Sequence, residues 1–242
     1  MSQTNDAYAV LRRSILDCEF APDSPLVISS LKARFGLGWT PLREALPRLE
    51  AEQLVRFEPN KGYRVAPATI AGLKDLQVAR TTVETTLLAQ SIERGDDGWE
   101  AELVGAHHLL AHTTAPTAGA VTPESLAWES RHKGFHQALL AAADAPWLEQ
   151  LARQTTDQLH RHHRFMLNGP DVIARLKGTS GKALRQTFAR TLGLSHHTQL
   201  MDAAIARDVS AAVALLEEHV GFSLAVYEAL WPEMENDHRQ TI

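Results

Sequence analysis

The sequence of 242 residues has a single cysteine, Cys18, and lacks any long hydrophobic run. One cysteine cannot form an intramolecular disulfide, which favours a reducing, cytoplasmic location. The first residues, MSQTNDAYAV, contain no basic segment followed by an apolar core, so they are not typical of a signal peptide. Because no apolar run reaches about 18 residues, we expect no membrane span.

Aromatic residues make up only 6% of the chain, whereas 44% of the residues are apolar, with alanine and leucine prominent. This composition favours helix over strand. The net charge of −5 argues against a protein that coats nucleic acid with its whole surface. Residues 1–66 nevertheless hold nine Lys/Arg and eight Asp/Glu, and the rest of the chain holds fifteen and twenty-one. The N-terminal part is therefore the only candidate for binding a polyanion.

The N-terminal part shows three helical patterns followed by a hairpin. Residues 7–18 and 28–36 have helical periodicity, and a third helix is predicted with Thr40 as its N-cap and Pro41 at its first position. Two short strands are predicted on either side of the turn at residues 60–62. Three helices and a hairpin, in this order, are typical of a winged helix-turn-helix.

After Pro67 only helical patterns recur. We therefore predict a mainly α protein with a domain boundary near 66–70: a winged helix-turn-helix domain at 1–66 and an all-α bundle of six or seven helices at 70–235. The first bundle helix is expected to end at Gly95, and the later helical segments are 99–113, 124–143, 146–167, 170–176, 182–206 and 209–231.

The stretches APDSPL, LKARFGLGWTPLREALPRLEAEQLV and NKGYRV resemble the winged helix of the GntR family of bacterial transcription regulators over residues 7–66. The resemblance implies a DNA-binding protein, and two departures stand out. Trp39 occupies a position where the family usually carries arginine, which removes one expected contact. Pro47 falls inside the predicted recognition helix and should kink or loosen it, at a cost of up to about 3 kcal/mol.

Physical chemistry also favours DNA binding by this segment. A helix N-terminus near Thr40 attracts phosphate, and Arg43 in the first turn suits the acceptor edge of guanine. Lys61 and Gly62 at the wing tip suit the minor groove. Three further arginines are predicted to contact phosphates: Arg12, Arg34 and Arg48. The atypical Trp39 is also included among the predicted DNA-binding residues. The alternative is that Arg43 merely forms solvated ion pairs on a surface helix.

The second part resembles the FCD type of ligand-binding domain over residues 70–231. The matching stretches are ARTTVE, WESRHKGFHQALLAAADAPWL and HTQLMDAAIARDVSAAVALLEEH. In that family an Asp and a His four residues apart, with two further His about 22 apart, hold a metal. The resemblance therefore implies a metal site, with histidine in place of the aspartate at the first position: His132, His136, His197 and His219.

Spacing supports this ligand set. Residues four apart share a helix face, as His132 and His136 would. His197 precedes Asp208 by eleven residues and His219 follows it by eleven, so a helical hairpin would bring both to one level. Two alternatives stay open: an i,i+4 histidine pair is often only a surface or hydrogen-bonded core pair, and His196 could replace His197.

Four neutral imidazoles suit a divalent transition metal, zinc or nickel foremost, better than Mg²⁺ or Ca²⁺. They leave the charge of the ion uncompensated, which favours a small carboxylic acid as effector. Arg80 is the expected anchor for its carboxylate, and Arg161 a weaker one. Glu84 could support the site or pair with Arg80.

The sequence thus predicts a ligand-responsive transcription regulator, a repressor by family analogy. A homodimer would read an inverted-repeat operator. Three alternatives remain: the ion itself is the signal, the ion is purely structural, or the histidines belong to a metalloenzyme. The sequence contains no HExxH motif and no nucleophile elbow, so nothing assigns a general base to such an enzyme.

Overall fold

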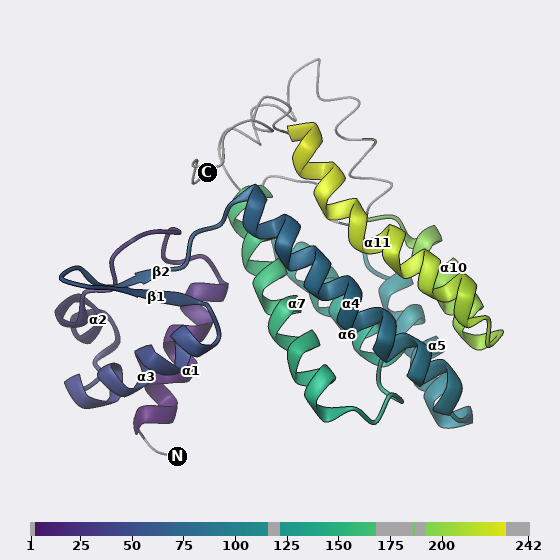
Figure 1. The fold of residues 1–242 in the computed structure, drawn as a ribbon, viewed down its shortest axis with the longest axis horizontal. Coiled ribbons are helices and arrows are strands. Elements are labelled where there is room, and N and C mark those ends of the chain that lie inside the picture. Colours follow the sequence, from purple (N-terminus) through teal and green to yellow (C-terminus); the bar gives the residue numbers. More distant parts are fainter. Residues whose placement is uncertain (1–2, 116–121, 168–185, 187–191, 231–242) are drawn as a thin grey trace. The chain divides into compact units, whose positions relative to one another are not determined.

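A computed structural model describes residues 3–115, 122–167, 186 and 192–230 of the chain (Figure 1). These residues form two compact units. The first comprises residues 3–73 together with 156–166, and the second comprises residues 74–155 and the described residues that follow 166. The two units are described separately below.

The N-terminal part of the first unit, up to Val65, contains three helices and a two-stranded antiparallel sheet, so the predicted winged helix-turn-helix is confirmed. The strands pair with Val55 opposite Val65 and Glu58 opposite Gly62. Gly62 has φ of 80°, a left-handed conformation that glycine adopts without strain, and this allows the tight wing turn. The elements are α1 (Gln3–Leu16), α2 (Ile28–Phe35), α3 (Trp39–Ala51), β1 (Val55–Glu58) and β2 (Gly62–Val65).

Helix α3 begins earlier than the sequence suggested, and the prediction that Thr40 caps it is wrong. Its N-cap is Gly38, whose backbone is extended and whose carbonyl accepts from the Leu42 amide at 3.3 Å. Pro41 still lies in the first turn, where a missing N–H costs nothing because those amides have no helical acceptor. The earlier start adds Trp39 and Thr40 to the helix.

Helix α3 also continues past Pro47 as one helix. Proline removes the bond to the Arg43 carbonyl, one turn before it. Residues on both sides of the proline, Leu42, Leu46 and Leu49, are completely buried in the core of the first unit. Burial of three leucines offsets the lost hydrogen bond, since each contributes about 1.5–3 kcal/mol.

The second unit is all-helical, as predicted; the residues before 74 at the start of α4 and residues 156–166 of α7 belong to the first unit. The predicted segment 170–176 and most of 182–193 lie outside the described residues. The helices described are α4 (Ile70–Arg94), α5 (Asp97–Ala111), α6 (Pro123–Leu139), α7 (Pro146–Leu167), α10 (Leu194–Ile205) and α11 (Val209–Leu230).

Side-chain caps and a tight turn define the ends of several helices in the second unit. The side chain of Asp96 caps α5 by accepting from the Trp99 amide, and Thr122 forms a capping box with Ser125 at the start of α6. Helices α10 and α11 lie side by side (Figure 1), joined by a tight turn in which Arg207 has φ of 60° and Asp208 accepts from the Ala211 amide. This is the hairpin predicted around Asp208.

One hydrophobic core joins α4, α5, α6, α10 and α11. Helix α11 contains a window, Val209–Glu228, that is long and apolar enough to cross a membrane by length and composition alone. Because this helix contributes to the core, the window is typical of the central helix of a globular domain. The buried core residues include Leu88, Trp99, Leu103, Phe135, Leu139, Leu200, Ala204, Ala212, Leu216 and Val220.

Candidate metal centre and DNA-binding face

Three helices of the second unit bring four imidazoles together. Helix α6 supplies His132 and His136, α10 supplies His197, and α11 supplies His219. One ring nitrogen of each lies within 4.8 Å of the others. The ring centroids of His136 and His197 are 4.7 Å from that of His219, and those of His132 and His197 are 4.9 Å apart. The predicted set therefore forms one compact cluster.

Hydrogen bonds leave lone pairs inside this cluster. The Nδ1 of His197 donates to the Gly193 carbonyl at 3.0 Å, so its Nε2 carries a lone pair. That Nε2 and the Nδ1 of His136 are buried and find no hydrogen-bond partner among the described residues. Buried polar atoms without partners are costly, and an ion at the centre would use the Nε2 lone pair of His197. A backbone carbonyl that orients a histidine in this way is common around metals.

The spacing within α6 also fits a transition metal. The Nε2 atoms of His132 and His136 are 3.3 Å apart. Two nitrogens held at about 2.0–2.1 Å by a tetrahedral zinc ion lie about 3.3 Å from each other. Behind this pair, the indole of Trp128 stacks on His132 with the rings 13° from parallel and 4.6 Å apart. Trp128 was not among the predicted site residues, although its spacing of four residues from His132 places both on one helix face.

Burial favours neutral, metal-binding imidazoles. It lowers the pKa of His136 well below the ordinary 6.5, and the neighbouring His132 and His219 lower it further. Burial likewise lowers the pKa of His197 to about 4. Both side chains therefore keep their lone pairs at neutral pH, as a metal ligand must.

His196 has a different role from its neighbour. Its Nε2 lies 2.9 Å from the Leu215 carbonyl, an atom that can only accept, so this nitrogen carries a proton. The ring of His196 also stacks against that of His219 at 5.5 Å. The ligand atoms that lie within 4.8 Å of one another include one from His197 and none from His196, which favours His197 as the ligand from α10.

Arg80 lies next to the cluster and is paired with Glu84. Both side chains are buried, with 6% and 2% exposed, and two hydrogen bonds of 2.9 and 3.0 Å join them. The charge of Arg80 is among the influences that lower the pKa of His136. The Nη1 atom of Arg80 makes no hydrogen bond to a described residue, which leaves one donor group for an anion.

Arg161 is placed differently, and this corrects its assignment as a second anchor. It belongs to the first unit, where its Nη1 donates to the Ala66 carbonyl at 2.7 Å and its Nη2 to the Pro67 carbonyl at 3.1 Å. With its side chain buried and its donors used by the backbone after β2, Arg161 fastens the end of the wing. The sequence could not reveal this, since the partners are about 95 residues away.

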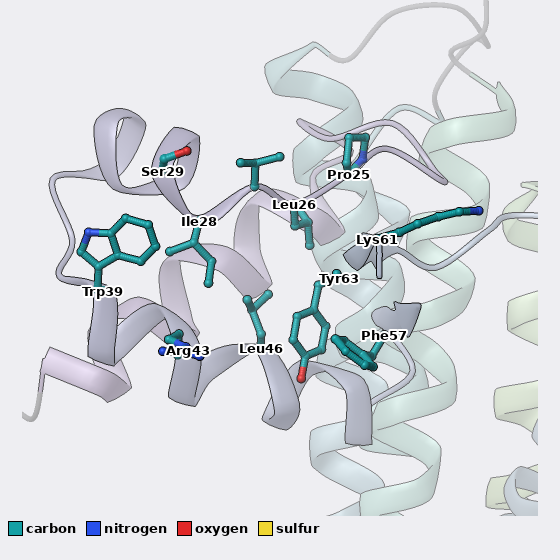
Figure 2. Close-up of a pocket in the computed structure, with 12 residues that line it drawn as sticks. Pro25, Leu26, Ile28, Ser29, Trp39, Arg43, Leu46, Phe57, Lys61 and Tyr63 are labelled. Atoms are coloured by element: carbon teal, nitrogen blue, oxygen red, sulfur yellow. The ribbon is translucent and has the colours of Figure 1, made fainter. Parts of the chain in front are cut away.

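A groove of about 510 Å³ lies in the first unit between α3 and the wing (Figure 2). Trp39 and Arg43 come from the first turns of α3, and Lys61 and Gly62 come from the wing turn. Arg43 is exposed and has no ion pair or hydrogen bond with a described residue. This groove brings four of the predicted DNA-binding residues to one surface, with Thr40 exposed on the same first turn of α3.

The other predicted DNA-binding arginines have partners within the protein. Arg12 is half-buried and pairs with Glu52 at 2.7 Å and Asp157 at 2.5 Å. Its role as a phosphate contact stays a prediction, and it would require Arg12 to leave these partners. Arg34 pairs with Glu19 at 2.5 Å, and Arg48 bonds to Asn5 at 3.0 Å. The last two are at the surface, where such pairs are weak and exchange readily.

Comparisons with known proteins agree with this architecture. Residues 3–65 match the family model of the bacterial regulatory proteins of the gntR family, and residues 75–222 match the FCD domain. The chain belongs to the GntR family, with an FCD domain. The chain is 34% identical over 215 residues, 89% of its length and 91% of the relative's, to the HTH-type transcriptional repressor GlaR of Escherichia coli K12.

Solved structures agree on the fold. A GntR transcriptional regulator from Rhodococcus sp. RHA1 has a TM-score of 0.64 at 20% identity, covering 95% of this chain and 99% of that one. Escherichia coli McbR/YncC has a TM-score of 0.63 at 20% identity, covering 94% and 98%. The GntR family and the matching relatives are regulators of transcription, so this protein is a DNA-binding regulator. This finding contradicts the alternative that the histidines belong to a metalloenzyme.

Proposed function

We propose that this GntR-family regulator is a cytoplasmic homodimeric repressor whose FCD domain binds a divalent transition metal, zinc or nickel, and a small carboxylic acid. The observation that carries the proposal is the convergence of His132, His136, His197 and His219 within 4.8 Å. Imidazole nitrogens are ligands that zinc and nickel accept readily, whereas Mg²⁺ and Ca²⁺ prefer oxygen.

The charge of the site supports an acidic effector. The four ligands are neutral imidazoles, so an ion bound by them keeps its full charge of +2. Glu84 does not compensate this charge freely, because it is already paired with Arg80. A carboxylic acid would neutralise the ion and accept a hydrogen bond from the Nη1 of Arg80.

Metal content tests the site directly. Protein purified without a metal-affinity step and supplemented with zinc or nickel should contain about one ion per chain by elemental analysis. The double variant His132→Ala/His136→Ala should lose it. His108→Ala/His112→Ala is a matched control, because these exposed histidines are also four residues apart, with His108 in the last turn of α5 and His112 at its C-cap. Wild-type protein without metal, or equal loss in the control, would contradict the proposal.

The regulatory role needs a second measurement. Two winged helices in a homodimer would read an inverted repeat, and an effector changes affinity only if it prefers one arrangement of the dimer. Operator binding should therefore be titrated with metal alone, acid alone and both. Release of the operator only when metal and acid are both present supports the proposal. Release by metal alone identifies a metal-responsive regulator instead, and an unchanged acid response in a metal-free His136→Ala variant makes the ion structural.

The name of GlaR supports repression rather than activation in this chain, since that relative is a repressor. A repressor should lower transcription from its operator in a reporter strain when it is expressed. An increase in transcription would assign activation.

A further inference from the structure

Trp39 is an unusual side chain for a water-facing surface. It is 50% exposed in the first turn of α3, and two further apolar side chains of the same groove, Val27 and Phe57, are 51% and 53% exposed. The hydrogen of its indole Nε1 finds no acceptor among the described residues. A large apolar ring with a free donor beside it is typical of a surface that contacts another molecule.

The position of Trp39 on α3 indicates which molecule contacts this surface. Trp39 and Arg43 are four residues apart, so they lie on one helix face, and Leu46 continues that face into the core. Figure 2 shows Trp39 and Arg43 at neighbouring places along α3, among the residues that line the groove. In a winged helix-turn-helix the N-terminal residues of the recognition helix reach base edges in the major groove. The occupant that suits both residues is DNA.

The chemistry of the groove narrows the choice of base. Thymine alone presents an apolar group in the major groove, its C5 methyl, and beside it the O4 acceptor. An indole offers an apolar face and one donor, with no acceptor. Guanine, by contrast, presents two acceptors to Arg43. Four residues of helix rise about 6 Å and one base pair about 3.4 Å, so the two contacts fall about two base pairs apart.

We infer that Trp39 is a specificity-determining residue that reads a thymine about two base pairs from the base contacted by Arg43, by packing on its C5 methyl group. The inference rests on the DNA-binding role of α3. An arginine at position 39 would instead favour guanine, so the tryptophan gives this protein a different operator preference from a relative with arginine there.

Removal of a single methyl group tests the inference. An operator is selected in vitro with the full-length protein, and each thymine is then replaced by deoxyuridine, which lacks only the methyl. At one thymine position in each half-site, this replacement should weaken operator binding by the wild-type protein about fourfold, because that is the effect of one buried methyl group. Trp39→Ala should bind weakly and show no further loss at that position. Trp147→Ala, which removes an exposed tryptophan outside the groove, should retain the wild-type sensitivity.

The outcomes separate the two ideas. If Arg43→Ala and Trp39→Ala both keep full specific affinity, α3 does not read the operator and the DNA-binding assignment of this helix fails. If Arg43→Ala loses specific binding while wild type and Trp39→Ala respond equally at every thymine, the assignment of α3 stands and the inference about Trp39 is overturned. Trp39→Phe keeps an apolar ring and should retain part of the methyl sensitivity, which distinguishes removal of the indole from misfolding of the domain. Loss of dimerisation in Trp39→Ala would assign the groove to a protein partner and also overturn it.

Discussion

His197 donates its Nδ1 proton to the carbonyl of Gly193, four residues earlier at the N-cap of α10. This bond fixes the tautomer before any ion arrives, because a carbonyl can only accept. The Nε2 lone pair is thus always present and buried. A preorganised ligand loses little freedom on binding, and this is the physical reason to expect a tight site.

The identity of residue 132 should set the metal preference. His132→Asp adds a negative charge and an oxygen ligand, so affinity for manganese should rise relative to zinc and nickel. The same charge partly neutralises the ion, and binding of an acidic effector should weaken by about tenfold, an estimate for one added charge near the site. Competition titrations of metal-free protein measure the metal preference, and calorimetry measures the affinity for the acidic effector. An unchanged metal order and effector affinity would place His132 outside the coordination sphere.

Removal of Arg80 should affect both stability and effector binding. Arg80→Met leaves Glu84 as an uncompensated buried carboxylate and should cost about 3–5 kcal/mol of unfolding free energy. In the double variant Arg80→Met/Glu84→Leu the charge is gone, so most of this loss should be recovered. Denaturant unfolding measures both.

Effector binding by the same two variants tests the role of Arg80 as an anchor. Both variants lack the guanidinium, so both should bind a carboxylic acid at least tenfold more weakly if a charge-assisted hydrogen bond is lost, while metal content stays near one ion per chain. Loss of metal together with the acid would mean that Arg80 only holds α4 in place.

These features differ in how far the sequence could predict them. Helix α7 spans the predicted residues 146–167, and α4 ends at Arg94, just before the predicted stop, Gly95, because periodicity and breakers are local signals. The grouping of the histidines followed from two local facts, a helix face and a hairpin turn. Asp157 lies 145 residues from its partner Arg12, and Ala66 lies 95 residues from its partner Arg161, so no local pattern encodes these contacts. The N-cap was misplaced because Gly38 has no side chain to signal it.

His162 should make the stability of the protein depend on pH. Burial lowers its pKa from 6.5 to about 4, with a further contribution from Arg161, so between these values the unfolded chain binds a proton that the folded chain does not. Its stabilising contribution is therefore complete above about pH 6.5 and is lost as the pH falls toward 4, by up to about 3 kcal/mol.

His162→Asn tests this dependence, because its amide can keep the hydrogen bond that Nδ1 donates to the Gln158 carbonyl at 2.9 Å but cannot titrate. Chemical unfolding between pH 4 and 7 should show a shallower pH slope than wild type. The exposed His112→Asn is the control and should leave the slope unchanged. A parallel slope in His162→Asn would exclude His162 as a source of the acid sensitivity.

Arg43 and Arg48 should differ in their contributions to DNA binding, although both are exposed arginines of α3. Arg43 has no partner among the described residues, whereas Arg48 bonds to Asn5 and lies 4.0 Å from the ring centroid of Tyr8. Arg43→Ala should weaken binding to the selected operator by about 10- to 100-fold, because one bidentate base contact is removed, and leave non-specific binding nearly unchanged. Arg48→Ala should lower affinity for all sequences equally, and the salt dependence should fall by about one ion because one phosphate is no longer neutralised. Affinities measured on specific and random duplexes over a salt series separate the two patterns. Equal discrimination between the duplexes by Arg43→Ala and wild type would show that the base contact comes from another residue.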